Sequence, residues 1–203
     1  MKNVWDEHYE RPKSKLAFPD ENLVRLLSRI QPTNRKALDF GCGSGRHSYL
    51  LQNEGYLVTA CDTAKTTIDS LNQNPSSIRW IFTPPDTNLP FSPSEFGLIV
   101  SWGVFHYNQR EDAKKLLSSL YSSLDEGGYL LGSIRAEGDT HLGLSKGKMN
   151  LVDLSGGYAE TYSLEDLKSF LSIFSNVSIG YSERTPLGKL EDRICHWFFL
   201  ACK

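Results

Sequence analysis

Short runs of apolar residues alternate along this chain with segments that carry apolar residues at helical spacing. The runs are typical of strands buried on both faces of a sheet, and they predict strands over residues 36–40, 56–61, 78–82, 96–102 and 129–135. The amphipathic segments between them predict helices over residues 20–30, 46–54, 63–72 and 109–124. Ser163 and Asp166 form a capping-box pattern that starts one more helix, and two closing strands are predicted over 177–181 and 194–202.

This alternation predicts an α/β fold with a doubly wound sheet, in which helices cover both faces of mostly parallel strands. Ligands bind such sheets beyond the carboxyl ends of the strands, so the residues that follow each strand are the functional candidates. The chain has 203 residues, the size of one ordinary domain, and we expect residues 1–203 to form a single one.

Composition and charge limit the partners. The formal net charge is −2, which argues against a surface that binds polyanions such as nucleic acid, with a local basic patch as the alternative. No apolar stretch approaches the roughly 20 residues of a bilayer span, and the first residues lack a secretory signal. We therefore expect no membrane partner and a cytoplasmic location. The four cysteines are scattered, so no metal site is expected.

A glycine-rich loop follows the first predicted strand, with the sequence Asp39-Phe40-Gly41-Cys42-Gly43-Ser44-Gly45. Glycine at every second position lets the backbone turn tightly and approach a ligand closely. The third glycine comes one residue too early for the Gly-x-Gly-x-x-Gly pattern of dinucleotide sites. An aspartate before the loop disfavours a pyrophosphate and suits a ligand that carries positive charge.

Two further acids follow the next two predicted strands. Asp62 lies about 20 residues after the loop, where a carboxylate accepts the hydroxyls of a ribose. The alternative is that Asp62 only caps the helix that starts at Thr63. Asp86 follows the third strand, where a carboxylate can receive an amine such as the adenine amino group, and an ordinary turn is the alternative.

Several segments in order resemble the motifs of class I S-adenosylmethionine-dependent methyltransferases. They are residues 38–45, 58–62, Asp86 with Leu89-Pro90-Phe91, 96–100 and 124–130, so the resemblance covers about residues 36–135. It implies a Rossmann-like three-layer α-β-α sandwich, whose seven-stranded, mostly parallel sheet has an antiparallel last strand. The chain departs from the family pattern at Gly97, where an aspartate is usual, and at Asp125-Glu126, which replaces Lys-Pro.

The resemblance also implies S-adenosyl-L-methionine as the cofactor and a role for each matching residue. The methionine part would be held by Asp39 and by the backbone of Gly41, Cys42, Gly43 and Gly45. Asp62 would hold the ribose, Asp86 the adenine edge, and Ser101 and Trp102 would line the methyl-donor centre; the neighbouring Thr63 is a further candidate for cofactor binding. The segment Trp5-Asp6-Glu7-His8-Tyr9 resembles a "WDxxY" opening that folds over the cofactor, so Tyr9 is a further candidate; a surface helix pinned by Trp5 is the alternative.

The acceptor is expected to be a small molecule, in preference to a protein. Methylation of nucleic-acid amines calls for an Asn/Asp-Pro-Pro-aromatic motif after the fourth strand, and this chain has Ser101-Trp102-Gly103-Val104 there. His106, in the following loop, is the candidate general base, and a packing role is the alternative. Residues 1–35 are expected to form a helical cap and the glycine-rich residues 136–158 a lid.

Charged side chains on or beside the lid leave two interpretations open. Either they bind an anionic acceptor, or they are exposed to solvent on a surface loop. They are Arg135, His141, Lys146 and Lys148. Two other functions also stay open, a regulatory protein that binds the cofactor without turnover and an NAD-dependent oxidoreductase. The oligomeric state does not follow from the sequence.

Overall fold

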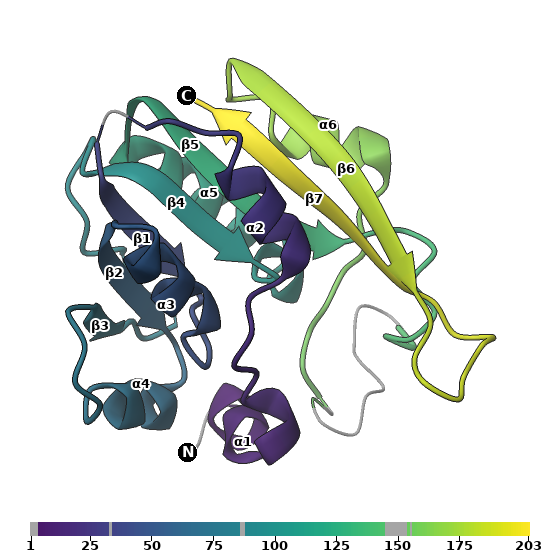
Figure 1. Ribbon diagram of the computed structural model, residues 1–203. Helices are drawn as coiled ribbons and strands as arrows, with labels where there is room; N and C mark the ends of the chain where they lie inside the picture. The colour runs from purple at the N-terminus through teal and green to yellow at the C-terminus, as the bar shows by residue number, and fades with distance from the viewer. Residues whose placement is uncertain (1–3, 33, 86–87, 145–153, 155) are drawn as a thin grey trace.

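One seven-stranded sheet forms the centre of the molecule, with the strand order β3-β2-β1-β4-β5-β7-β6 (Figure 1). The computed structural model describes residues 4–32, 34–85, 88–144, 154 and 156–203. The strands are β1 Lys36–Phe40, β2 Leu57–Asp62, β3 Arg79–Phe82, β4 Phe96–Trp102, β5 Leu124–Arg135, β6 Asn176–Arg184 and β7 Ile194–Cys202. Neighbours pair in parallel except at β7, which is antiparallel to both β5 and β6. The predicted sheet, with its antiparallel last strand, is confirmed.

Helices cover both faces of this sheet, which confirms the predicted three layers (Figure 1). The described helices are α1 Val4–Glu10, α2 Glu21–Leu27, α3 Arg46–Asn53, α4 Lys65–Leu71, α5 Arg110–Ser123 and α6 Leu164–Phe170, with two 3-10 turns, η1 Pro12–Ser14 and η2 Phe105–Tyr107. Apolar side chains of α2, α3 and α4 share one core with one face of the sheet, and those of α5 and α6 share a second core with the other face. None of the described helices has the length and apolar character that a membrane span needs.

The chain departs from the family pattern at Gly97 because there is no room for a side chain. A Cβ atom at this position would lie 2.0 Å from the main-chain oxygen of Asn34. The register between β4 and β5 also shifts here, between Phe96 and Leu98. An aspartate at this position would force the segment before β1 away from β4.

Strand β5 begins five residues earlier than the sequence predicts. The acids and glycines of residues 125–128 predict a break before a strand at 129, whereas β5 starts at Leu124, which pairs with Phe96 of β4. Gly127 has a φ of +71°, a conformation that glycine adopts without strain. The chain therefore bends within a continuous strand instead of ending one.

The first part of the predicted lid, residues 136–144, is fastened to the sheet and is not an open loop. The buried Asp139 carboxylate pairs with Arg135 at 2.5 Å and accepts the backbone N–H groups of Leu142 and Cys195, each at 2.9 Å. Leu142 is fully buried. The solvated-loop interpretation is therefore wrong for Arg135, while Lys146, Lys148 and most of the lid lie outside the described residues.

Candidate functional site

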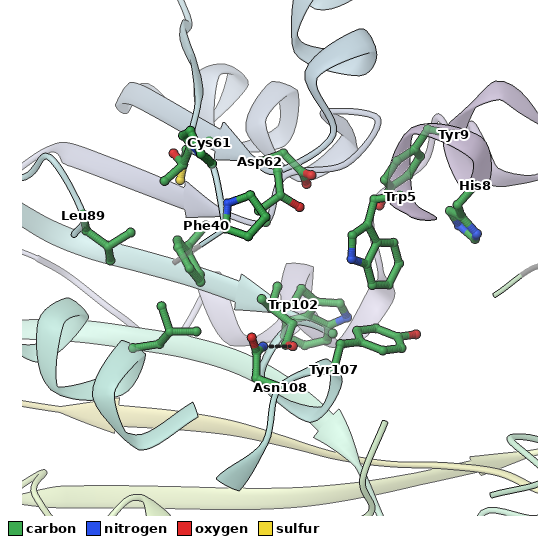
Figure 2. A pocket seen from close by; sticks show the side chains of 18 residues that line it. Trp5, His8, Tyr9, Phe40, Cys61, Asp62, Leu89, Trp102, Tyr107 and Asn108 are labelled. Atoms are coloured by element: carbon green, nitrogen blue, oxygen red, sulfur yellow. Dashed lines mark hydrogen bonds between the residues drawn. The ribbon is translucent and has the colours of Figure 1, made fainter. Parts of the chain in front are cut away.

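A cavity of about 350 Å³ opens at the carboxyl ends of β1, β2 and β4, where the order of the strands along the chain reverses (Figure 2). Its walls come from the residues that follow these strands and β3, and from α1 and η2. The volume lies near the lower end of the range for small-molecule sites, about 300–1,000 Å³. This is the position in which the α/β fold is expected to bind its ligand.

One side of the cavity, which we call the cofactor wall, consists of Gly41, Cys61, Asp62 and Thr63. Asp62 organises it through both carboxylate oxygens. Oδ2 accepts the N–H of Gly43 at 2.7 Å and Oδ1 accepts the N–H of Ala64 at 2.8 Å. The carboxylate thus holds the glycine loop against the end of β2 and also caps the turn before α4. Burial raises the pKa of Asp62, and the backbone donors oppose that shift.

The glycine loop needs glycine for space as well as for conformation. Gly41 and Gly43 have φ values of +74° and +52°. A Cβ atom would lie 2.4 Å from Val104 Cγ2 at Gly41 and 2.2 Å from the hydroxyl of Tyr9 at Gly43. The loop backbone is therefore in direct contact with α1 and with the loop after β4. A side chain at either position would push these elements away from the cavity.

The structure places Asp39 behind the glycine loop and not in the cavity wall. Its carboxylate is 1% exposed and accepts the hydroxyl of Ser48, on α3, at 2.6 Å. Burial raises the pKa of Asp39 to about 7, although the Ser48 hydrogen bond opposes the shift. Direct contact of Asp39 with a ligand is thus a prediction that the geometry does not favour.

The other predicted cofactor residues divide between the cavity and the layers behind it. Gly41, Asp62, Thr63, Trp102 and Tyr9 line the cavity. Four others do not line it: Cys42, Gly43, Gly45 and Ser101. Gly43 still shapes the wall through its bond to Asp62, and Gly45 caps α3 with a φ of +81°. Asp86 lies outside the described residues.

The opposite side of the cavity is aromatic. This aromatic wall consists of Trp5, His8 and Tyr9 from α1, Trp102 from the end of β4, and Tyr107 from η2. The Trp5 ring meets the rings of Tyr107 and His8 edge to face, with centroids 4.7 and 5.8 Å apart. Sequence reasoning missed His8 and Tyr107, although both lie in segments singled out for function. Figure 2 shows Trp5 above Trp102 and Tyr107, with Asp62 at the side.

Helix α1 is held over the cavity by contacts to elements far away in sequence. The buried Asp6 carboxylate accepts both the N–H of Thr66 at 3.0 Å and its hydroxyl at 2.8 Å, which fixes α1 to α4. The linker to α2 is held at the start of α3, where Ser44 donates to Leu16 O at 2.7 Å and Arg46 to Phe18 O at 3.1 Å. Helix α1 therefore closes one side of the cavity, which favours the predicted role of Tyr9 over the alternative of a surface helix pinned by Trp5.

His106 is buried behind the cavity and does not line it. Its Nδ1 accepts the backbone N–H of Arg135 at 3.3 Å, so a neutral ring carries its proton on Nε2. Burial, with the positive charge of Arg135, holds the pKa of His106 well below its usual value. A buried Nε2 that already carries a proton is a poor base, so the geometry favours the packing role.

The electrostatic character of the cavity suits a cationic ligand. No lysine or arginine lines it in the part of the chain that the structure describes, and Asp62 is the single carboxylate there. Carboxylate, close backbone approach and aromatic faces together fit a nucleoside that carries a sulfonium, the chemistry that the family resemblance implies. No cluster of possible metal ligands occurs among the described residues.

Comparison with known proteins agrees with this chemistry. A family model described as a methyltransferase domain matches residues 37–128. The chain is 28% identical over 166 residues to the bovine 18S rRNA (guanine-N(7))-methyltransferase, covering 76% of this chain and 58% of the relative. It is 32% identical over 127 residues to the probable S-adenosyl-L-methionine-dependent methyltransferase TehB of Haemophilus influenzae, covering 62% and 44%. The chain thus spans only about half the length of these relatives.

A solved structure shares the fold over nearly the whole chain. It is the 1,6-didemethyltoxoflavin-N1-methyltransferase of Burkholderia thailandensis, with 1,6-didemethyltoxoflavin and S-adenosylhomocysteine bound. The match has a TM-score of 0.64 at 18% identity and covers 99% of this chain and 81% of that one. At this identity the likeness concerns the fold alone.

Proposed function

We propose that this chain is a class I S-adenosylmethionine-dependent methyltransferase, as its sequence motifs predict, and that it methylates a small-molecule acceptor in the cavity beneath α1. The observation that carries the proposal is the pairing of two walls across one cavity. One wall is built from the strand ends and the loop that match the family motifs, and the other is aromatic and closed by α1.

The residues of the cofactor wall bind and orient S-adenosylmethionine in this proposal. When bound, the cofactor would supply a methyl group activated by the sulfonium. The electron pair of the carbon–sulfur bond would go to sulfur, a lone pair of the acceptor would form the new bond to carbon, and a proton released by an oxygen or nitrogen acceptor would go to water. Asp62 accepts the ribose hydroxyls while it keeps the glycine loop in place. Asp86 matches the family position that binds the adenine edge, and in this proposal it binds that part of the cofactor. Positioning does most of the work, because the leaving group is already activated.

Helix α1 excludes water and limits the size of the acceptor. Tyr9 contacts the glycine loop at Gly43, and Trp5 contacts Tyr107 across the opening. This enclosure supports a small molecule in preference to a nucleotide within a polymer.

An RNA base is the second candidate acceptor, because one relative is an rRNA guanine methyltransferase. Two observations weigh against it. The chain has a formal net charge of −2, and no lysine or arginine lines the cavity among the described residues. Binding of RNA depends strongly on positively charged contacts to phosphates.

The test is methyl transfer from radiolabelled S-adenosylmethionine to two fractions of one cell extract, the small molecules below a few kilodaltons and the purified RNA. We expect label in the small-molecule fraction, and at least about tenfold less label when Asp62→Ala replaces the intact chain at a low concentration of S-adenosylmethionine. Label in RNA alone would select the second candidate. Binding of S-adenosylhomocysteine without transfer to either fraction would support the regulatory alternative, and binding of NAD instead would support the oxidoreductase.

A further inference from the structure

We propose that the aromatic wall is the acceptor subsite and that the acceptor is an uncharged, planar aromatic molecule with its nucleophilic oxygen or nitrogen on the ring system. The proposal rests on the proposed function and goes further, because it assigns a chemical class to the acceptor. It also assigns Trp5, Trp102 and Tyr107 as the residues that select this class.

The first argument is the shape of the wall. Rings from three separate elements, α1, β4 and η2, surround one space, and Figure 2 shows the indole of Trp5 above Trp102 and Tyr107. Each ring is held by a neighbour: Trp5 meets Tyr107 with centroids 4.7 Å apart, and His47 meets Trp102 with centroids 6.0 Å apart. Rings that are held in place offer flat contact surfaces at a small cost in entropy. A planar aromatic molecule complements such surfaces by stacking and edge contacts.

The second argument is charge. An anionic acceptor needs a cation in the wall, and no lysine or arginine lines the cavity in the described ranges. Arg135, the nearby candidate, is 11% exposed and is neutralised by the buried Asp139 carboxylate at 2.5 Å. The wall therefore selects against carboxylates and phosphates.

The third argument separates an uncharged acceptor from a cationic one. An ammonium group in an aromatic site is usually bound by the faces of several rings. A site that selects a cation also places a carboxylate close to the ammonium group, where it can pair with the positive charge. Here both oxygens of Asp62 are already engaged by the backbone of Gly43 and Ala64, and the ribose is expected to use the same group. Asp6, the other acid near α1, is engaged by Thr66 of α4. No described carboxylate is left to the aromatic wall.

The test measures binding of four matched probes to the intact protein saturated with S-adenosylhomocysteine. The probes are a naphthol, the corresponding hydroxynaphthoate, decahydronaphthol and a naphthylmethylammonium ion, and the readout is isothermal titration calorimetry. They share one ring skeleton and differ in charge or aromaticity. We expect the naphthol to bind at least about tenfold more tightly than each of the other three.

Variants assign this binding to the wall. Trp5→Leu and Tyr107→Leu should each weaken naphthol binding by about threefold to tenfold, and Trp5→Phe should retain most of it, because a ring is kept. Phe18→Leu is the matched control: Phe18 is 84% exposed on the linker to α2 and should leave naphthol binding unchanged. The affinity for S-adenosylhomocysteine should stay within about threefold in all four variants, which also shows that they fold.

Three results would overturn the proposal. They are no naphthol binding up to millimolar concentration, equal or tighter binding of the hydroxynaphthoate or the ammonium probe, and unchanged naphthol binding in both Leu variants. The failure of the proposed function is distinguishable from these results, because it is measured by methyl transfer to the two extract fractions and by S-adenosylhomocysteine binding, and not by the four probes.

Discussion

The two walls of the cavity are built in different ways. The cofactor wall comes from strand ends and a glycine loop within 23 residues of sequence, from Gly41 to Thr63, and Asp62 ties it together through backbone hydrogen bonds. The aromatic wall brings Trp5 together with Trp102 and Tyr107, about 100 residues away, through side-chain packing. The first wall is fixed by local backbone geometry, whereas the second depends on how α1 docks.

This difference assigns the two walls to different tasks. Hydrogen bonds from a rigid sheet suit a ligand whose shape is constant, which is the cofactor. A wall that rests on a docked helix is open to change in sequence without loss of the sheet, which suits an acceptor that varies between relatives. Changes in the cofactor wall should therefore have larger effects on cofactor binding than changes in the docking of α1.

The largest effect is expected at Asp62, because one side chain serves the ligand and the loop. In Asp62→Ala the N–H groups of Gly43 and Ala64 lose their acceptor together with the ribose hydroxyls. Hydrogen bonds to charged groups contribute about 1.5–3 kcal/mol, so the affinity for S-adenosylhomocysteine should fall by about tenfold to a hundredfold. Calorimetry measures the loss, and Asp69→Ala, at an exposed ion pair on α4, is the control. If the affinity for S-adenosylhomocysteine is unchanged in Asp62→Ala, Asp62 only caps the turn before α4.

The next effect tests whether the two walls are in contact. In Gly43→Ala the new Cβ would lie 2.2 Å from the Tyr9 hydroxyl, in a backbone with a φ of +52°. Steric overlap and strain together should lower the affinity for S-adenosylhomocysteine by about tenfold. In the double variant with Tyr9→Ala the overlap is gone, so the two losses should be less than additive. Strict additivity in this cycle would mean that Tyr9 and the loop act independently.

A smaller effect is expected where α1 docks on α4. Asp6→Ala removes the acceptor for the N–H and the hydroxyl of Thr66. Helix α1 should then open more often, which raises its rate of cleavage in limited proteolysis and weakens S-adenosylhomocysteine binding by only about threefold. Glu7→Ala, an exposed residue of the same helix, is the comparison. A loss as large as that of Asp62→Ala would contradict the division of tasks between the walls.

The smallest effect on cofactor binding is expected at Asp39, and its signature is pH dependence. Burial raises its pKa from 3.8 to about 7, so the folded protein keeps this proton where the unfolded chain has lost it. The contribution of Asp39 to stability is therefore full below about pH 4 and is lost as the pH rises to about 7. Asp39→Asn, which keeps an oxygen for Ser48, should remove this fall and change S-adenosylhomocysteine affinity by less than about threefold.

Urea unfolding of both proteins between pH 4 and pH 8 measures this difference. The comparison cancels other groups, such as His47, whose pKa burial lowers to about 3 and whose contribution has the opposite sign. Parallel stability curves for the two proteins would show that Asp39 is ionised throughout. A tenfold loss of S-adenosylhomocysteine affinity in Asp39→Asn would show instead that the Asp39 carboxylate contributes to cofactor binding.

The cofactor wall was accessible from the sequence because its parts are local. Asp62 follows a strand at the spacing of a ribose ligand, and glycine at every second loop position matches the positive φ values. The position of Asp39 behind the glycine loop could also have been predicted from the sequence, but the sequence analysis placed Asp39 in contact with the cofactor. In a strand alternate residues share a face, so Asp39 lies with Ala37 on the face covered by α3 and points away from the face of Phe40.

The aromatic wall could be predicted only in part. The opening segment with Trp5 and Tyr9 was a candidate, but the contact between Trp5 and Tyr107 joins residues without a shared local pattern. Their meeting depends on the docking of α1 through Asp6 and Thr66, which no spacing rule contains. The anchoring of residues 136–144 by Asp139 was missed for the same reason, because its partner Cys195 lies on β7, at the other end of the chain.

The central claim is that the cavity beneath α1 is a site for S-adenosylmethionine and its product. Calorimetric titration of the intact protein with S-adenosylhomocysteine, beside a titration with NAD, tests it most directly. The account predicts one site for S-adenosylhomocysteine, a raised melting temperature on its addition, and no heat with NAD. Binding of NAD alone, or S-adenosylhomocysteine binding that Asp62→Ala leaves unchanged, would contradict it.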